Sequence, residues 1–334
     1  MVTELRATPV TLDQLVDAYL ISRRHLSPHT QGYYHNCLSN FQWYARKAGW
    51  PEAAGELTRE HIREFLRYVA QSPKRWGQAG CTSSRHRASP ATVNHYGRVI
   101  KRLFRWASDE EEYLPDNGIW RLKLPPPHYR QIEPYSDGEV MAMLDAGDEE
   151  ESRLLASRNK AIIAMFADTG LRLSELAGIK LSDLHASLKQ VRVSGKGSKM
   201  RIVPLQGESM KALNRYLMYR PRDGGDWLWL SDDGQPLQMR SIQNMVQRLK
   251  RRAGVKSSGG VHRFRHYFAT RYLEAGGNPS SLRLLLGHES FAMVLHYTRM
   301  VSAQHAVDEH ISPLNQLYRG GNHKRGDDGW GWHY

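Results

Sequence analysis

The segment QVRVSGKGSKMRIVPL (Gln190–Leu205) indicates the fold class of this chain. Its two short runs alternate apolar and polar residues, as strands with one buried face do. A glycine-containing loop, Gly-Lys-Gly-Ser-Lys, separates the runs and is typical of a β-hairpin. We expect one further strand near 227–230, while most of the remaining chain carries helical periodicity. The sequence therefore predicts a mainly α fold with a small antiparallel β-sheet, an α+β architecture.

Helices are predicted on both sides of the hairpin from their caps and from the spacing of apolar residues. Thr11 with Gln14, and Ser136 with Glu139, form capping-box patterns at two helix starts. The amphipathic helices expected in the first third of the chain are 11–24, 27–49, 58–71 and 89–108. The proline-rich segment that follows has no sustained period, which indicates a linker. We therefore expect a helical domain at 1–113, a linker at 114–134, a second domain at 135–318 and a flexible tail at 319–334.

The charge balance of the chain predicts a polyanionic partner. Among 334 residues, 47 are Lys or Arg and 34 are Asp or Glu, which gives a formal net charge of +13. Neutralising phosphates releases counterions, so nucleic acid is the favoured partner. No apolar run reaches about 18 residues and no signal peptide is evident, so we expect no membrane partner and a cytoplasmic protein bound to DNA. The two cysteines, Cys37 and Cys81, form no CxxC pair and predict neither a disulfide nor a thiolate metal site.

A long segment without acidic residues is the strongest local sign of a DNA-binding surface. From Phe65 to Ser108 the chain holds no Asp or Glu, and Trp76, Tyr96 and Trp106 lie among the basic residues. A solvated basic face is the alternative interpretation of such a run. Interleaved aromatic residues favour phosphate contacts instead. The predicted DNA-binding residues, which include two on the hairpin, are Lys74, Arg75, Arg85, Arg87, Arg98, Lys101, Arg102, Lys199 and Arg201.

Motif comparison predicts no metal site and no nucleotide site. His262 and His266 stand four residues apart, as zinc-binding helices require, but the glutamate of HExxH is missing and arginines lie between them. The segment SGKGSK does not match GxxxxGK[ST], because Gln190 replaces the first glycine and Gly197 follows the lysine. We therefore expect the protein to use no metal and no small-molecule cofactor.

A set of polar residues remains as candidates for chemistry. Taken singly, each has a structural interpretation: Arg172 as a helix-end ion pair with Glu175, or Tyr297 as a packed core residue. Taken together, they combine two arginines, a lysine, two histidines and a tyrosine within the second domain. The candidate catalytic residues are Arg172, Lys196, His262, Arg265, His288 and Tyr297.

The segments TGLRLSEL, GKGSKMRIVPL, HRFRHYFAT and LGHES, followed by Tyr297, resemble in that order the motifs of the tyrosine recombinase (phage integrase) family. The resemblance extends over about 134–318 and implies a tyrosine recombinase catalytic domain there. It also implies a helical core-binding domain before it, in a Xer-like layout without a separate arm-binding domain. Phe264, Tyr267 and His296 depart from the usual family residues, but no motif loses its chemical group.

The resemblance implies a phosphate-binding role for three of the candidates. Arg172 and Arg265 would hold the nonbridging oxygens of a DNA phosphate, and His288 would donate a further hydrogen bond. Guanidinium groups suit this role, because they stay protonated and form forked hydrogen bonds to anionic oxygens. One such preorganised donor is typically worth about 3 kcal/mol in the transition state.

The other three candidates would carry out the bond making and the proton transfers. Tyr297 is the implied nucleophile, His262 assists the loss of its proton, and Lys196 protonates the leaving 5′-oxygen. The product is a 3′-phosphotyrosyl link and a free 5′-hydroxyl. Because one ester replaces another of similar energy, the reaction requires neither ATP nor a metal.

The implied function is site-specific cleavage and rejoining of double-stranded DNA for integration, excision or resolution of DNA elements. Four protomers would act together, as a homo-tetramer or as a hetero-tetramer with a related recombinase. A C-terminal helix at 303–318 would dock on a neighbouring protomer. Two alternatives stay open: a type IB topoisomerase-like relaxation enzyme, and a catalytically inactive DNA-binding protein of the same fold.

Overall fold

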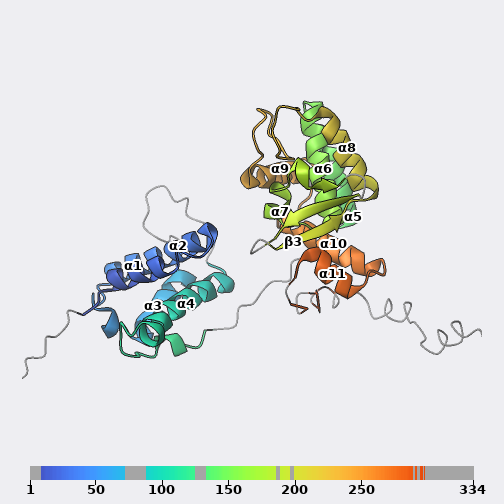
Figure 1. Cartoon of the computed structure of the whole chain (residues 1–334). Helices are drawn as coiled ribbons and strands as arrows, with labels where there is room; N and C mark the ends of the chain where they lie inside the picture. The colour runs from blue at the N-terminus through green and yellow to red at the C-terminus, as the bar shows by residue number, and fades with distance from the viewer. Residues whose placement is uncertain are drawn as a thin grey trace, which may run out of the picture. The chain divides into compact units, whose positions relative to one another are not determined.

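The computed structural model describes residues 9–71, 88–124, 133–185, 189–195, 199–288, 290–291, 294–295 and 297. The chain divides into two compact units, 1–130 and 131–334, which Figure 1 shows in blue to green and in green to orange. Each unit has its own hydrophobic core. Within these described ranges, no helix is both long enough and apolar enough to cross a membrane.

The first unit is helical, as the apolar spacing predicts. Its described elements are α1 (Leu12–Ser22), α2 (Pro28–Lys47), η1 (Ala54–Glu56), α3 (Arg59–Gln71), α4 (Pro90–Arg105), η2 (Trp106–Glu110) and η3 (Ile119–Arg121). Thr11 and Gln14 form the predicted capping box of α1. Ser27 and Ser89 cap α2 and α4, each directly before a proline at the first helical position. The helices predicted for this region are therefore confirmed.

The first part of the predicted linker packs in the first unit, which corrects the boundary placed at residue 113. Leu114, Ile119 and Leu122 are buried in the same hydrophobic cluster as the helices. Lys101 of α4 also donates a hydrogen bond from Nζ to the Leu122 carbonyl over 2.7 Å. The prolines of this segment suggested an extended chain, but the burial of three apolar side chains holds 114–122 against the helices.

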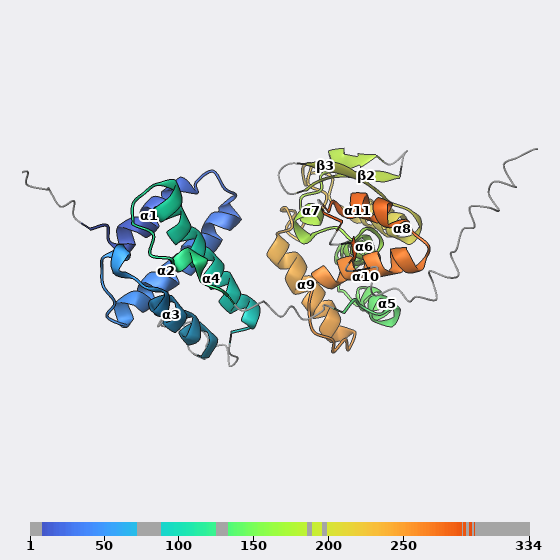
Figure 2. The ribbon, with the colours of Figure 1, turned by 90° about the horizontal axis from the view of Figure 1, so that it is seen from below.

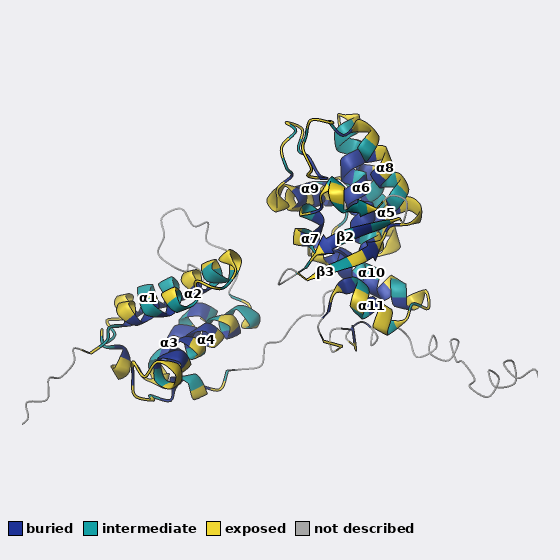
Figure 3. Cartoon of the chain, in the orientation of Figure 1, coloured by how far each residue is buried: buried dark blue, intermediate teal, exposed yellow. Residues whose placement is uncertain are grey.

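The second unit combines helices with a small sheet. Its described elements are α5 (Asp137–Ala146), α6 (Arg153–Thr169), α7 (Leu173–Ala177), η4 (Leu181–Asp183), β1 (Leu184–His185), β2 (Gln190–Ser194), β3 (Met200–Pro204), α8 (Gly207–Tyr219), α9 (Met239–Arg252), α10 (His262–Glu274) and α11 (Pro279–Leu286). Helix α6 packs against both α8 and α10 (Figure 2). Residues 161–166 of α6 are all buried, which Figure 3 shows in dark blue. The predicted α+β class is confirmed, with α6 at the centre of the unit.

The predicted hairpin is confirmed and gains a short edge strand. Strands β2 and β3 pair antiparallel, and β1 pairs with β2, so the described strands have the order β1-β2-β3. The strand predicted near 227–230 is wrong, because this segment forms only isolated bridges. The Leu228 amide donates to the Ile179 carbonyl instead of joining the sheet. The apolar residues of this buried, extended segment therefore form a sequence pattern like that of a strand.

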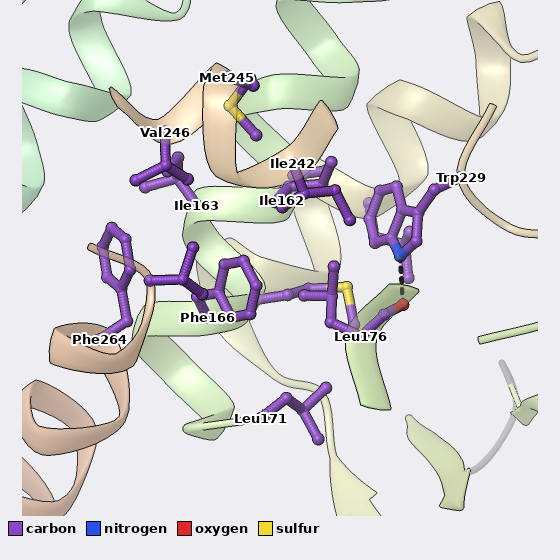
Figure 4. Packing of buried hydrophobic residues seen from close by; sticks show 14 of the residues in the cluster. Ile162, Ile163, Phe166, Leu171, Leu176, Trp229, Ile242, Met245, Val246 and Phe264 are labelled. Atoms are coloured by element: carbon purple, nitrogen blue, oxygen red, sulfur yellow. Dashed lines mark hydrogen bonds between the residues drawn. The ribbon is translucent and has the colours of Figure 1, made fainter. Parts of the chain in front are cut away.

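The core of the second unit fixes the position of α7. Ile162, Ile163 and Phe166 of α6 are fully buried among apolar side chains that include those of α9 and α10 (Figure 4). Trp229 packs in the same cluster, and its indole Nε1 donates to the Leu176 carbonyl of α7 over 2.8 Å. Because α7 is tied to this core, the residue at its N-cap has a fixed place.

Candidate active site

One cleft in the second unit brings together five of the six candidate catalytic residues. Its volume is about 670 Å³, and β3, α10 and the ends of α7 and α11 contribute to its lining. The five candidates among its lining residues are Arg172, His262, Arg265, His288 and Tyr297. Lys196 lies outside the described residues. Gly195 and Lys199, on either side of its loop, both line the cleft.

A left-handed glycine before α7 sets the direction of Arg172. Gly170 follows α6 with φ of 60°, and a Cβ there would lie 2.6 Å from Phe268 Cδ1. Glycine is therefore required at this turn by its backbone conformation and by the available space. Arg172 caps α7, and both its amide and its guanidinium donate to the Glu175 carboxylate over 2.8 Å. Arg172 therefore both pairs with Glu175 and lines the cleft.

Glu175 is a buried carboxylate shared by two arginines. The residue is 3% exposed. Arg201 donates to its two oxygens through both terminal nitrogens, over 2.7 and 2.9 Å. Burial alone would raise the pKa of Glu175, but hydrogen bonds from Arg201 and from the Arg172 amide hold the pKa at about 2. The carboxylate therefore stays ionised and balances part of the positive charge of the cleft.

The C-terminal end of α11 supplies further acceptors for the arginines. The last carbonyls of a helix lack helical partners and carry the negative end of its dipole. Arg265 donates to the Leu286 carbonyl over 2.7 Å, and Arg172 reaches the same carbonyl over 3.3 Å. Arg201 Nε donates to the Leu285 carbonyl over 2.7 Å. These bonds hold three cationic side chains close together despite their mutual repulsion.

Arg265 remains a cation although it is buried. Burial lowers its pKa to about 10, and the charge of Arg172 acts in the same direction. That value still lies well above neutral pH, so the guanidinium stays protonated. Among the described residues at this end of the cleft, Arg172, Arg265 and Arg201 therefore stand against the carboxylate of Glu175. The resulting net charge of these four groups is about +2, which suits an anion such as a phosphodiester.

His288 is held neutral at the edge of this charge cluster. It follows Gly287, which ends α11 in the left-handed conformation. Burial, followed by the charges of Arg265 and Arg172, lowers the pKa of His288 to about 4. The imidazole Nδ1 is buried and has no hydrogen-bond partner among the described residues. A neutral imidazole carries one N–H, so His288 can donate a hydrogen bond to a bound anion.

Tyr297 lies near two histidine rings. It is 2% exposed, its ring is stacked on that of His288 at 6.2 Å, and the His266 ring meets it edge-on at 5.4 Å. Burial raises the pKa of Tyr297, against the opposing effect of Arg265 and Arg172. The phenol is therefore neutral in this state. A base must take its proton before or during any attack on phosphorus.

His262 can act as that base. It is the first residue of α10, and part of its side chain is exposed. Partial desolvation, followed by the charges of Arg265 and Arg172, lowers the pKa of His262. A neutral imidazole accepts a proton through its free ring nitrogen. The ring centroids of His262 and His266 lie 5.6 Å apart, so the two histidines share one side of the cleft.

Two residues contribute to the site in ways that the sequence did not indicate. His266 is buried against Tyr297, and its spacing of four residues from His262 was considered only as a metal motif. Arg201 was predicted to contact DNA, and this stays a prediction; in the structure its guanidinium binds Glu175 and its Nε donates to the Leu285 carbonyl. In the described part of the chain, no group of His, Cys, Asp or Glu residues could hold a metal ion.

The predicted DNA-binding residues that the structure describes lie in different environments. Arg98 and Arg102 are exposed on α4, with one Arg102 nitrogen donating to the Tyr34 hydroxyl over 2.7 Å. The Lys101 amine is engaged with the Leu122 carbonyl, which makes it a weaker candidate for a phosphate contact. Lys199 lines the cleft. The remaining candidates lie outside the described residues: Lys74, Arg75, Arg85 and Arg87.

Comparison with known proteins identifies the family of this chain. The model of the phage integrase family matches residues 137–304, which include every candidate catalytic residue. The chain belongs to the phage integrase family of site-specific tyrosine recombinases. The expected resemblance is thereby confirmed, and so is the expected enzyme class.

Similarity to individual family members extends through both units. The tyrosine recombinase XerC of Stutzerimonas stutzeri (strain A1501) is 30% identical over 309 residues, covering 88% of this chain and 93% of that protein. The Tn1549 transposon integrase in complex with a circular intermediate DNA has a TM-score of 0.71 at 19% identity, over 90% of this chain and 98% of that chain. A lambda integrase dimer bound to a core site has a TM-score of 0.65 at 18% identity, over 85% and 97% of the two chains. The two structures support the fold of this family member.

Proposed function

We propose that this recombinase cleaves DNA with Tyr297 as the nucleophile. The observation that carries the proposal is the position of the Tyr297 ring in one cleft with two guanidinium groups and two imidazoles that are neutral at physiological pH. A scissile phosphodiester is an anion that repels an attacking oxygen, so a cationic cleft addresses the main barrier to the reaction. Arg172, Arg265 and His288 donate hydrogen bonds to its nonbridging oxygens.

The chemical step transfers the phosphoryl group to the enzyme. The Tyr297 Oη attacks phosphorus as His262 takes the phenolic proton, and the bond from phosphorus to the 5′-oxygen breaks. Lys196 protonates that oxygen. The products are a 3′-phosphotyrosyl ester and a 5′-hydroxyl end, and attack by another 5′-hydroxyl reverses the step. Because the ester bond is conserved throughout, rejoining requires no ATP.

The partner is double-stranded DNA. The exposed Arg98 and Arg102 of α4 and the cationic cleft support this assignment, as does the net charge of +13. The Tn1549 and lambda integrases cited above are themselves DNA complexes. We propose that the first unit is the core-binding domain and the second the catalytic domain, and that four protomers act on two sites. Such a complex, acting in the cytoplasm, integrates, excises or resolves DNA elements.

A covalent trap tests the proposed function. A pool of duplexes with a randomised central sequence and a nick within it is incubated with the protein in EDTA. A cleaved strand then loses its short 5′-hydroxyl fragment, and the protein stays attached to DNA. We predict SDS-resistant adducts with the wild-type protein and none with Tyr297→Phe, which lacks only the hydroxyl. Adducts of equal yield with Tyr297→Phe would contradict the nucleophile assignment.

The recovered duplex also separates recombination from the topoisomerase alternative. The adducts are sequenced, and supercoiled plasmids with and without the enriched sequence are compared. A site-specific recombinase acts on the plasmid that carries the sequence. Equal relaxation of both plasmids would favour a type IB topoisomerase-like activity instead.

A further inference from the structure

An arginine occupies an inward position of the hairpin, against the usual pattern of a strand. Successive side chains of a strand point to opposite faces, and the apolar ones normally face the core. On β3, however, Met200 and Ile202 are 63% and 58% exposed. Arg201 lies between them and pairs across the strands with the buried Val193. Such inversions are expected where function overrides folding preferences.

The inward guanidinium of Arg201 connects three elements. Its side chain is 12% exposed, and it binds both oxygens of Glu175 in α7. Its Nε donates to the Leu285 carbonyl in α11 over 2.7 Å. A buried charge is tolerated only with such full pairing. Arg201 therefore holds β3, α7 and the end of α11 at fixed positions relative to one another.

Arg172 and Arg201 share the carboxylate of Glu175, and this sharing determines how free Arg172 is to contact a bound anion. One carboxylate oxygen, Oε1, accepts from Arg172 over 2.8 Å and from Arg201 over 2.7 Å. If Arg201 lost its charge, Arg172 would be the remaining guanidinium on an almost fully buried carboxylate. Charge pairing would then draw Arg172 toward Glu175 and away from the open side of the cleft.

We infer that Arg201 is a positioning residue, which neutralises Glu175 so that Arg172 is available to the scissile phosphate. Through the Leu285 carbonyl, it also holds the end of α11 from which His288 extends. This inference rests on the proposed function and deepens it. Arg201 acts on the phosphate through its neighbours, so the prediction differs from that for a residue that binds DNA directly.

A double-mutant cycle tests the inference. The rate of adduct formation is measured in a single turnover on the duplex recovered from the pool, for wild type, Arg201→Gln, Glu175→Gln and the double variant. We expect Arg201→Gln to slow the reaction about 100-fold, the size of effect produced by a displaced catalytic group. In the Glu175→Gln background, the same change should cost less than about threefold, because no buried charge then draws Arg172 away.

A conservative variant and a matched control separate positioning from folding. Arg201→Lys keeps the charge but not the forked geometry, so we expect a smaller loss, about 10-fold. Arg192→Gln removes a neighbouring arginine of the hairpin, which pairs with Asp183 over 3.1 Å and lies outside the cleft lining. It should leave the rate unchanged. The inference is overturned if Arg201→Gln slows adduct formation equally in both backgrounds and lowers the thermal midpoint by a corresponding amount.

Binding of inorganic phosphate provides a test that needs no DNA cleavage. Histidine NMR resonances are followed while phosphate is added to the four proteins of the cycle. We expect Arg201→Gln to weaken binding about 10-fold and the added Glu175→Gln change to restore it. Equal affinity in all four proteins overturns the inference. Absence of any wild-type adduct would refute the proposed function, and the phosphate series then decides on Arg201 by itself.

Discussion

At the scale of the residue, the cleft keeps its reactive groups neutral beside concentrated positive charge. Tyr297 is protonated because burial outweighs the arginines, and His288 is unprotonated because burial and the arginines act together. The difference follows from the sign of each charged form. A phenolate is favoured by nearby cations, whereas an imidazolium is disfavoured by them.

The lowered pKa of His288 predicts a dependence of stability on pH. The pKa is about 4 in the folded protein, against about 6.5 in the unfolded chain. Between these values the unfolded state binds the extra proton, so the free energy of unfolding falls as the pH drops from about 6.5 to about 4. The full loss from this group is about 3 kcal/mol. Urea unfolding at pH 7.5 and pH 4.5 should show a smaller loss for His288→Gln than for wild type, and equal losses in both proteins would contradict this assignment.

Single residues were predictable from the sequence to the extent that their chemistry was distinctive. Two arginines, two histidines and a tyrosine in ordered motifs predicted five residues that line the cleft. The partner of Arg201 was not predictable, because Glu175 and Leu285 approach it only through the packing of three elements. A basic residue on a hairpin is interpreted as a surface cation unless it is known that its side chain lies on the buried face of the sheet.

At the scale of the element, the ends of helices do the positioning. Arg172 stands at the start of α7, His262 at the start of α10, and His288 just after the end of α11. The glycines at Gly170 and Gly287 turn the chain with positive φ so that these ends meet. The helix caps and these glycines could be identified in the sequence, as the capping boxes at Thr11 and Ser136 illustrate. The packing of 114–122 could not be predicted, because its burial depends on contacts with residues far away in the sequence.

Gly170 and Gly207 form a matched pair for testing the turn before Arg172. Both have positive φ, of 60° and 52°, but a Cβ at Gly170 would meet Phe268 and Leu286, whereas Gly207 has open space. We expect Gly207→Ala to cost about 1 kcal/mol of stability from backbone strain alone. Gly170→Ala adds overpacking and should cost about 2–4 kcal/mol.

Cleavage should follow the same order. Gly170→Ala displaces Arg172 and should slow adduct formation at least about 10-fold, whereas Gly207→Ala should leave the rate unchanged. Thermal midpoints and single-turnover rates of the two variants check both effects. Equal costs in the two variants would show that the crowding around Gly170 does not matter.

At the scale of the whole molecule, one unit carries the cleft and the other an exposed basic helix. The sequence predicted both units and their types, since each has its own periodicity and charge pattern. It placed the boundary too early, because proline content hid the apolar residues of 114–122.

The basic face of α4 predicts the salt dependence of DNA binding. Each phosphate contact adds about one unit to the slope of log affinity against log salt concentration. We expect Arg98→Gln to reduce the slope by about one. Arg63→Gln on α3, whose side chain is paired with Glu60 over 3.1 Å, should leave it unchanged. Fluorescence anisotropy over a range of salt concentrations measures both slopes. An unchanged slope for Arg98→Gln would make this face of α4 an ordinary solvated surface.

The site of covalent attachment identifies the nucleophile. Trypsin cuts after Arg283 and Arg299, and the peptide between them, residues 284–299, contains a single tyrosine, Tyr297. The trapped adduct is digested with nuclease and trypsin, and the modified peptide is fragmented in a mass spectrometer. We predict a nucleotide joined through its 3′-phosphate to Tyr297. Attachment to any other residue, or through a 5′-phosphate, would contradict the assignment of Tyr297 as the nucleophile that forms a 3′-phosphotyrosyl link.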